Sequence, residues 1–296
     1  MSKIAFLGLG VMGAPMAGHL ARAGHQITGY NRTSARAQAW RSDLAGEGIE
    51  IALADTPAAA ASGQDVVVSC VGNDADLCEV VLGENGALAA MRKGALFIDH
   101  TTVSPATARQ IVSEAAARSV LALDAPVSGG QAGAQNGKLS IMCGGSEAAM
   151  AAARPLLEAY AARIVHIGAD GAGQACKMVN QVCIAGLLAG LAEGVRLAQA
   201  SGLDLTKVRE AIGAGAAQSW QMDNRWETMA ADKFDFGFAI DWMRKDLDIA
   251  LRAADEAGLA LPVTALIDQF YAEVQADGGA RQDTSALVRR YRKAGA

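Results

Sequence analysis

A glycine-rich segment at the amino terminus constrains the fold more than any other part of this sequence. Gly8-Leu9-Gly10-Val11-Met12-Gly13 fits the pattern G-x-G-x-x-G, directly after the apolar run Lys3–Leu7 and before a helical pattern, Ala14–Ala23. In a strand-turn-helix unit the first glycine allows a tight turn, the second admits a pyrophosphate and the third lets helix pack on strand. The segment therefore predicts a dinucleotide site formed by Gly8, Gly10, Val11, Met12 and Gly13.

Strand and helix patterns alternate up to about Gly168. The β-rich runs are Ile4–Leu7, Ile27–Tyr30, Asp65–Val71, Ala95–Asp99, Val120–Asp124, Leu139–Cys143 and Ile164–Ile167, and helical stretches include Pro15–Ala23, Pro105–Arg118 and Glu147–Ala159. This alternation is typical of a parallel sheet covered by helices on both faces. We expect an α/β Rossmann domain with a doubly wound parallel sheet over residues 1–168.

The strand signal disappears after Ala172. Gln174–Ser201 has the pattern of one long, mostly apolar helix, and further helical runs follow at Asp204–Ala214, Ile240–Ala257 and Val263–Asp277. We expect an all-α C-terminal domain over residues 169–296.

The residues after the second predicted strand indicate which dinucleotide binds. NAD enzymes carry Asp or Glu there to bind the ribose 2′-hydroxyl, whereas this chain has Asn31-Arg32-Thr33. A guanidinium can bind a 2′-phosphate that a carboxylate would repel. We therefore predict NADP(H), bound through Asn31, Arg32 and Thr33; the alternative is that Arg32 is a solvated loop cation.

Two loops that follow strands are candidates to line the nicotinamide side. They contain Val71 and Thr102, and loops at the carboxyl ends of strands form the ligand crevice of open α/β sheets. Alternatively, Thr101 and Ser104 cap the helix that begins at Pro105, and for Ser104 we favour the cap.

A third such loop contains Ser128-Gly129-Gly130, whose hydroxyl and backbone N–H groups suit a substrate carboxylate. A plain Ser-Gly-Gly turn explains it equally well.

Lys177 lies in the first turns of the long apolar helix, and lysine is rarely buried without a partner. Asn180 and Gln181 follow three and four residues later, which puts all three on one helical face. They are candidates for the polar floor of a substrate site; the alternative is that Lys177 extends to solvent.

Composition excludes several classes of protein. A net charge of -5 and scattered Lys and Arg argue against nucleic-acid binding, and we interpret the basic tail Arg289–Lys293 as a solvated helix end. The His and Cys residues lack metal-ligand spacing, so no metal is expected. The uninterrupted apolar run Val182–Ala192 is shorter than the roughly 20 residues of a membrane span, and the glycine-rich start is unlike a signal peptide. We therefore expect a cytoplasmic protein with no membrane contact.

Four segments together resemble the β-hydroxyacid dehydrogenase family, which includes 3-hydroxyisobutyrate dehydrogenases and tartronate semialdehyde reductases. They are Gly8–Ala17, Asp124–Gly130, Gly171–Gln181 and Ile240–Ala250. The resemblance implies hydride transfer between NAD(P) and a β-hydroxy acid or its semialdehyde, with Lys177 as the catalytic lysine and Ser128, Gly129 and Gly130 as the substrate-carboxylate loop. It also implies that Lys245 reaches the cofactor, that Thr102 lies near the nicotinamide, and that the protein is a homodimer or homotetramer.

The sequence departs from the family at two positions. Gln181 stands where many members have Asn, although Asn180-Gln181 resembles the tartronate semialdehyde branch, and the loop Val71–Asp76 lacks a common proline. Two alternative functions remain: an NADPH-dependent imine reductase of the same fold, which typically lacks a lysine at position 177, and a non-catalytic NADP-binding interaction module. We predict a semialdehyde reductase whose individual substrate the sequence leaves open.

Overall fold

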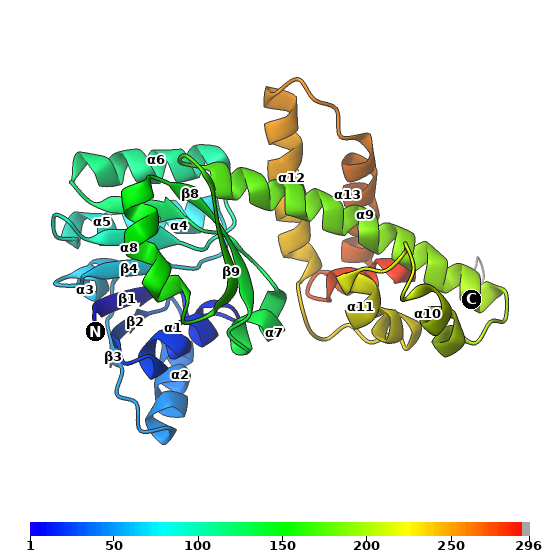
Figure 1. The fold of residues 1–296 in the computed structure, drawn as a ribbon, viewed down its shortest axis with the longest axis horizontal. Helices are drawn as coiled ribbons and strands as arrows, with labels where there is room; N and C mark the ends of the chain where they lie inside the picture. Colours follow the sequence, from blue (N-terminus) through cyan, green and yellow to red (C-terminus); the bar gives the residue numbers. More distant parts are fainter. Residues whose placement is uncertain (292–296) are drawn as a thin grey trace. The chain divides into compact units, whose positions relative to one another are not determined.

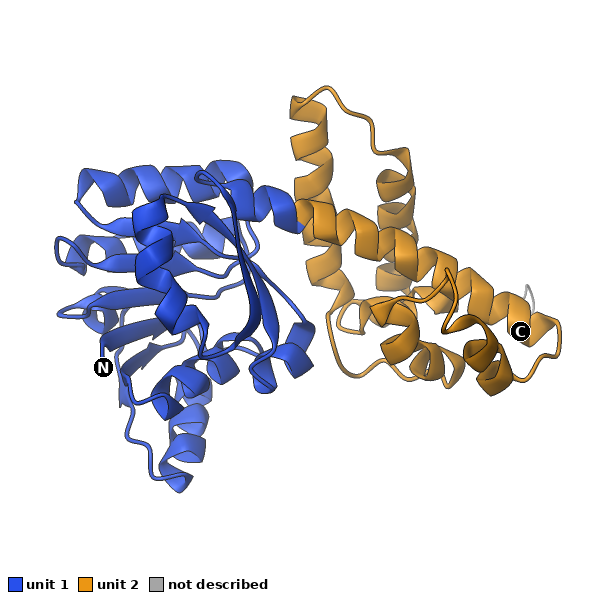
Figure 2. Cartoon of the chain, viewed as in Figure 1, with its two compact units in different colours: residues 1–177 blue, residues 178–296 orange. Residues whose placement is uncertain are grey.

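The structure is a computed structural model that describes residues 1–291 (Figure 1). The chain forms two compact units, Met1–Lys177 and Met178–Ala296 (Figure 2). The division falls inside one continuous helix, whereas the sequence pattern placed the domain boundary at residue 168, where the strand signal stops. Part of the predicted basic tail, residues 292 and 293, lies outside the described residues.

The first unit contains a nine-stranded sheet. Its strands are β1 (Lys3–Leu7), β2 (Gln26–Tyr30), β3 (Ala52–Leu53), β4 (Val66–Ser69), β5 (Leu96–Asp99), β6 (Leu121–Asp124), β7 (Val127–Ser128), β8 (Leu139–Gly145) and β9 (Ala161–Gly168). The order is β3-β2-β1-β4-β5-β6-β8-β7, with β9 paired to β8, and β1 to β6 are parallel. Strands β2 and β3 lie on one side of β1, and β4, β5 and β6 lie on the other, as in a doubly wound sheet. Such sheets bind ligands in the crevice where the strand order reverses.

The sheet is not parallel throughout, because β8 runs antiparallel to both β6 and β7. Leu123 of β6 pairs with Gly145, and Ser128 of β7 pairs with Ser140 near the other end of β8. Between β6 and β7 lies Pro126, whose carbonyl accepts a hydrogen bond from Met142 N at 3.1 Å. The chain thus continues along β8 past the end of β6, and this continuation carries Ser128.

Helices of the first unit begin where short polar side chains or prolines favour it. The helices are α1 (Gly13–Arg22), α2 (Ser34–Gly46), α3 (Pro57–Ala61), α4 (Asp74–Leu82), α5 (Ala87–Ala90), α6 (Pro105–Ala117), α7 (Gly130–Gln135), α8 (Glu147–Leu157) and the start of α9 (Ala172–Ala200). Thr56, Asn73, Ser104 and Ser146 each accept a hydrogen bond from a backbone N–H of the first turn. The predicted cap at Ser104 is therefore present.

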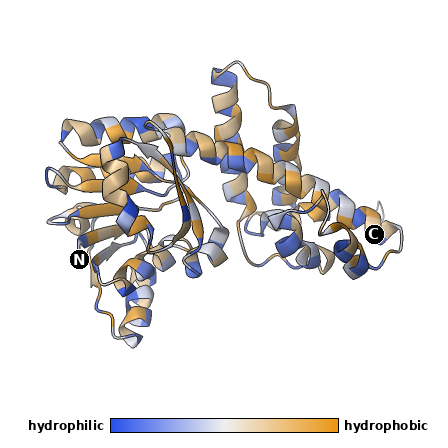
Figure 3. Cartoon of the chain, in the orientation of Figure 1, coloured by the Kyte–Doolittle hydropathy of each residue, from blue (hydrophilic) through white to orange (hydrophobic). Residues whose placement is uncertain are grey.

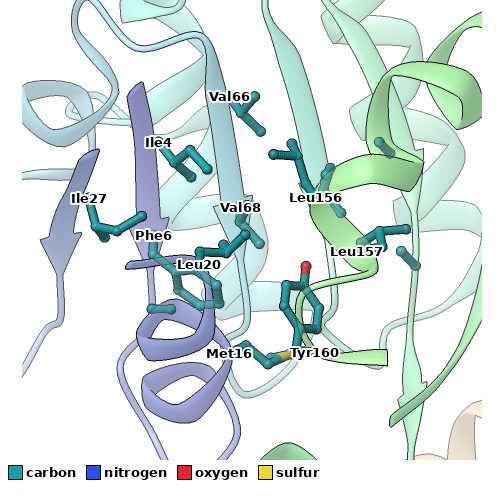
Figure 4. Packing of buried hydrophobic residues seen from close by; sticks show 14 of the residues in the cluster. Ile4, Phe6, Met16, Leu20, Ile27, Val66, Val68, Leu156, Leu157 and Tyr160 are labelled. Atoms are coloured by element: carbon teal, nitrogen blue, oxygen red, sulfur yellow. The ribbon is translucent and has the colours of Figure 1, made fainter. Parts of the chain in front are cut away.

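Both faces of the sheet are covered, which explains why its strands are apolar on both sides. In β1, Ile4 and Phe6 belong to one hydrophobic cluster, and Ala5 and Leu7 to the other. Figure 4 shows the first cluster, where Leu20 of α1 and Leu157 of α8 pack beside the strand residues. The side-chain alternation of one strand thus holds helices on both faces of the sheet.

The second unit is helical. It contains the rest of α9, then α10 (Leu205–Ile212), α11 (Trp220–Ala230), α12 (Ile240–Glu256) and α13 (Pro262–Val274), followed by a π-helical turn (Gln275–Gly279) and a 3₁₀ segment (Thr284–Tyr291). Its core includes Trp226, Phe234, Met243 and Tyr271. The predicted Rossmann domain followed by an all-α domain is confirmed.

Helix α9 is rich in apolar residues along its length (Figure 3). By length and composition it could cross a membrane, and 39% of its apolar window is buried in this structure. Core helices of globular proteins pass the same test, so this is weak evidence, and the predicted lack of membrane contact stays a prediction.

Two glycines of α9 give a matched test of packing. A Cβ on Gly173 would lie 2.8 Å from Asp124 O and Oδ2, whereas a Cβ on Gly186 would meet nothing within 4 Å. We expect Gly173→Ala to lower the free energy of unfolding by roughly 1–3 kcal/mol, the cost of overpacking. Gly186→Ala should raise it by roughly 0.4–1 kcal/mol, because alanine favours the helix. Urea unfolding of both variants checks this, and equal effects would contradict the close approach at Gly173.

Candidate functional site

The three fingerprint glycines have three different environments. Gly8 has φ +99°, and a Cβ there would collide with Cys70 O; a Cβ on Gly13 would collide with Gly8 O. Both glycines are therefore required for the turn and for helix packing. A Cβ on Gly10 would meet nothing within 4 Å, so the backbone is open on that side. This combination fits a pyrophosphate approaching the loop at Gly10.

The amino terminus of α1 suits the same phosphates. Its N-cap residue, Met12, provides no side-chain cap, and the first turn contains no acidic residue. The helix dipole favours an anion at this position. Val11 is 58% exposed, so the loop before the helix is accessible.

Asn31 connects the two loops that flank this position. Its Oδ1 accepts a hydrogen bond from Leu9 N at 3.0 Å, and its Nδ2 donates to Thr33 O at 2.9 Å. Asn31 therefore fixes the glycine loop in addition to its predicted contact with the cofactor. Arg32 is exposed, and its Nη1 lies 2.8 Å from Asp76 Oδ1 of α4.

A buried hydrogen-bond network holds the loops that contain Val71 and Thr102. Val71 N donates to Thr101 Oγ1 at 3.0 Å, and Asp99 Oδ1 accepts from Thr101 N and Ser69 Oγ. Thr101 is therefore not a helix cap, since its hydroxyl binds the neighbouring loop. Thr102 is partly buried next to it.

Lys177 and the Ser-Gly-Gly loop lie together. Lys177 is 6% exposed, and its Nζ donates to Val127 O at 2.9 Å, one residue before Ser128. The alternative, that Lys177 extends to solvent, is thus disfavoured. Gly129 (φ +128°) and Gly130 (φ +60°) turn the chain directly afterwards. The Lys177 ammonium group therefore contacts the backbone one residue before Ser128 and the turn of two glycines, all within the first unit.

Two further buried residues fix the helix that carries Lys177. Asp124 accepts hydrogen bonds from Gly171 N at 2.7 Å and Gln174 N at 2.9 Å, and so caps the amino terminus of α9. The side chain of Gln174 is fully buried, donates to Thr101 O and accepts from Val103 N. Neither residue was among the predicted site residues, although both occur in segments that carry the family resemblance.

Asn180, Gln181 and Lys245 belong to the second unit, where a chain of polar contacts joins them. Asn180 Nδ2 donates to Gln181 Oε1 at 2.7 Å, Gln181 Nε2 donates to Asp246 Oδ2 at 2.7 Å, and Lys245 Nζ lies 3.1 Å from Asp246 Oδ1. Gln181 is 1% exposed, so its amide serves internal hydrogen bonding in this structure. Asp246, also buried, links α9 to α12 and was not predicted as a site residue.

Burial shifts the pKa values of three groups at the carboxyl edge of the sheet. Loss of hydration raises the pKa of Asp99 to about 7 and of Asp124 to about 6, and lowers that of His100 to about 4. Hydrogen bonds partly counter the two carboxyl shifts. His100 lies between Ala125 O and Tyr160 OH. Within residues 1–291, no group of three or more His, Cys, Asp or Glu residues is arranged to hold a metal.

We expect the free energy of unfolding to fall as pH rises from about 4 to about 7. In this window the unfolded chain has lost the protons of both carboxyls, whereas the folded chain keeps them up to about 6 and 7. The folded state then binds more protons, so rising pH destabilises it. Between about pH 4 and 6.5 His100 acts in the opposite direction, since its unfolded ring is protonated and its folded ring is neutral. Its contribution to the free energy of unfolding rises with pH and offsets that of one carboxyl.

Asp99→Asn tests this assignment, because an Asn Oδ1 can still accept from Ser69 and Thr101. Of the three groups with shifted pKa values, only Asp124 and His100 then remain. Their opposite effects should make the free energy of unfolding nearly independent of pH below about pH 6. Urea unfolding across this pH range measures the slope, with the exposed Asp55→Asn as control. A wild-type slope in Asp99→Asn would exclude Asp99 as the titrating group.

Comparison with known proteins identifies the family. Residues 3–168 match the NAD-binding domain of 6-phosphogluconate dehydrogenase, and residues 171–291 match the NAD-binding domain of NADP-dependent 3-hydroxyisobutyrate dehydrogenase. An uncharacterised oxidoreductase of Shewanella frigidimarina is 55% identical over 99% of both chains. The 2-hydroxy-3-oxopropionate reductase of Escherichia coli is 36% identical over 97% of this chain and 96% of its own.

A solved structure agrees with these matches. Mycobacterium tuberculosis 3-hydroxyisobutyrate dehydrogenase, determined with L-serine, has a TM-score of 0.87 and 34% identity, and the match covers 99% of this chain and 100% of that one. The expected relationship is therefore confirmed, and the chain belongs to the β-hydroxyacid dehydrogenase family of NAD(P)-binding oxidoreductases.

Proposed function

We propose that this protein reduces a small carboxylate-bearing semialdehyde to the β-hydroxy acid with NADPH, and that Lys177 is its general acid. The observation that supports this most is the contact between Lys177 Nζ and Val127 O, 2.9 Å long, beside Ser128-Gly129-Gly130. It joins a proton donor to groups that can bind a carboxylate. The Escherichia coli relative is a reductase of a hydroxy-oxo acid, and the Mycobacterium tuberculosis protein is a hydroxy-acid dehydrogenase. Both names support the same substrate class.

The bound nicotinamide supplies the hydride, and residues of this chain manage charge and orientation. The substrate carboxylate binds to Ser128 Oγ and the backbone of Gly129 and Gly130. Negative charge develops on the aldehyde oxygen as hydride arrives, and Lys177 Nζ stabilises this oxygen and transfers a proton to it. In the oxidative direction the neutral amine accepts the proton. Because Lys177 also donates to Val127 O, its ammonium group is oriented before substrate binds.

The cofactor assignment depends on the fingerprint loop and on Arg32. The open side of Gly10 and the uncapped start of α1 support pyrophosphate binding. Asn31 in place of a carboxylate, followed by the exposed Arg32, supports NADP(H). Thr33, Val71 and Thr102 remain proposed cofactor contacts because they follow strands of the sheet, and Lys245 because of the family resemblance. Asn180 and Gln181 remain proposed substrate contacts because they follow Lys177 at helical spacing.

The rival functions are less well supported. An imine reductase does not require a lysine that protonates an oxygen, and a non-catalytic module does not require Lys177 to be buried and oriented. The burial and orientation of Lys177 thus favour a carbonyl-reducing enzyme.

We also propose that the protein is a cytoplasmic homo-oligomer. All five cysteines are free thiols, in keeping with a reducing compartment. In the single chain, α9 exposes Val179, Leu187 and Leu197 at 65%, 48% and 69%. An apolar face of this kind is typical of a subunit interface. Light scattering should therefore give a dimer or tetramer mass, and a monomer mass at micromolar concentration would contradict the proposal.

A substrate panel with Lys177 variants tests the proposed reaction. Short semialdehydes, the corresponding β-hydroxy acids and cyclic imines are each assayed with NADPH and NADH, and semialdehydes with NADPH should turn over fastest. Lys177→Met should lower turnover by roughly 10²–10⁴-fold, the usual contribution of a general acid, while NADPH binding is retained. The exposed Lys207→Met is the control. Imine-selective activity, or near-normal turnover of Lys177→Met, would refute the proposal.

A further inference from the structure

Asp76 holds the cation that the proposed function assigns to the cofactor 2′-phosphate. Arg32 follows β2 and Asp76 lies in the first turn of α4, after β4, so their loops come from the two strands on either side of β1. Arg32 Nη1 is 2.8 Å from Asp76 Oδ1. The two residues therefore meet beside the glycine loop, 44 positions apart in sequence.

Asp76 is the fixed member of this pair. The Arg32 side chain is 75% exposed, whereas that of Asp76 is 21% exposed. The backbone of Asp76 is held by the N-cap of α4, since Asp76 N donates to Asn73 Oδ1 at 2.9 Å. A carboxylate in the first turn of a helix is also stabilised by the helix dipole. The exposed guanidinium thus pairs with a carboxylate whose position the helix sets.

The charge of Asp76 affects the two cofactors in opposite ways. A 2′-phosphate that binds the Arg32 guanidinium must compete for it with the Asp76 carboxylate. The phosphate and the carboxylate are both negative, so they repel each other. A ribose 2′-hydroxyl can instead donate a hydrogen bond to a carboxylate. The position that usually carries this carboxylate is occupied by Asn31 in this chain. Asp76 places a carboxylate nearby from helix α4, which follows β4.

We propose that Asp76 is a specificity-determining residue that competes with the 2′-phosphate for Arg32 and lowers the preference for NADP(H) over NAD(H). This inference depends on the proposed function in one respect, the assignment of Arg32 to the 2′-phosphate. Asp76 acts as the counter-charge of Arg32, and the selectivity of the site is the balance between the two.

The test measures binding of two probes that differ in the 2′-phosphate, adenosine 2′,5′-bisphosphate and adenosine 5′-monophosphate, by calorimetry on the full chain. Asp76→Asn keeps a side chain that can hydrogen-bond to Arg32 and removes the charge. It should tighten the bisphosphate by roughly two- to fivefold at low salt, the upper part of the range expected for an exposed charge pair, and change the monophosphate less than about twofold. High salt should reduce the effect.

Glu79→Gln is the matched control, because Glu79 is exposed, lies on the same helix and acts on Arg32 only as a weaker, longer-range charge. It should shift the probe ratio less than about twofold. In an Arg32→Ala background the effect of Asp76→Asn should be smaller, because competition for Arg32 is lost and only the repulsion between Asp76 and the phosphate remains. An unchanged or weaker bisphosphate affinity in Asp76→Asn, or an equal shift in Glu79→Gln, overturns the inference.

The Arg32→Ala variant separates the role of Asp76 from the assignment of Arg32 to the 2′-phosphate. If it weakens the bisphosphate but Asp76→Asn has no effect, the competition is wrong while the NADP assignment stands. If Arg32→Ala leaves the probe ratio unchanged, the NADP assignment itself fails, and the inference about Asp76 fails with it.

Discussion

The first turns of α9 depend on polar contacts with the carboxyl edge of the sheet, and the proposed chemistry depends on those turns. Asp124 caps the helix, Gln174 binds the loop at Thr101–Val103, and Lys177 binds the carbonyl of Val127. All three side chains are nearly or fully buried. Buried polar groups persist only when they are hydrogen-bonded, so removing one partner would leave another unsatisfied. The position of the Lys177 ammonium group is therefore set by several bonds at once.

Close backbone approach makes this anchor possible. A Cβ on Gly144 would collide with Asp124 Oδ1, and a Cβ on Gly173 would come within 3 Å of Asp124 as well. Glycine at both positions lets the helix end approach the sheet closely enough for the carboxylate to reach two N–H groups. The shift of β8 to the antiparallel direction has a related role, because it extends the chain past β6 to Ser128. Fold geometry and site geometry are thus set by the same residues.

The charged groups near the sheet edge differ in how far they are exposed to solvent. Asp99 and Asp124 are buried, and their raised pKa values reflect the cost of burying charge. Arg32 and Asp76 form an ion pair that is more open to solvent, where water stabilises both charges. The buried groups position loops, and the more exposed pair costs less to separate. The difference follows from solvent access.

The sequence by itself determined the order of elements and the glycine loop, because periodicity and turn chemistry are local properties. All seven predicted strands are present, whereas β3 and β7, two residues each, are too short to leave a periodic signal. The roles of Asp99, Asp124, Asp76 and Asp246 were decided only by the tertiary structure, since each binds a partner 30 or more positions away or a loop from another strand. Gln181 donates to Asp246 in the tertiary structure, because the packing of α12 brings that buried carboxylate to it, and a pattern of spacings carries no such information.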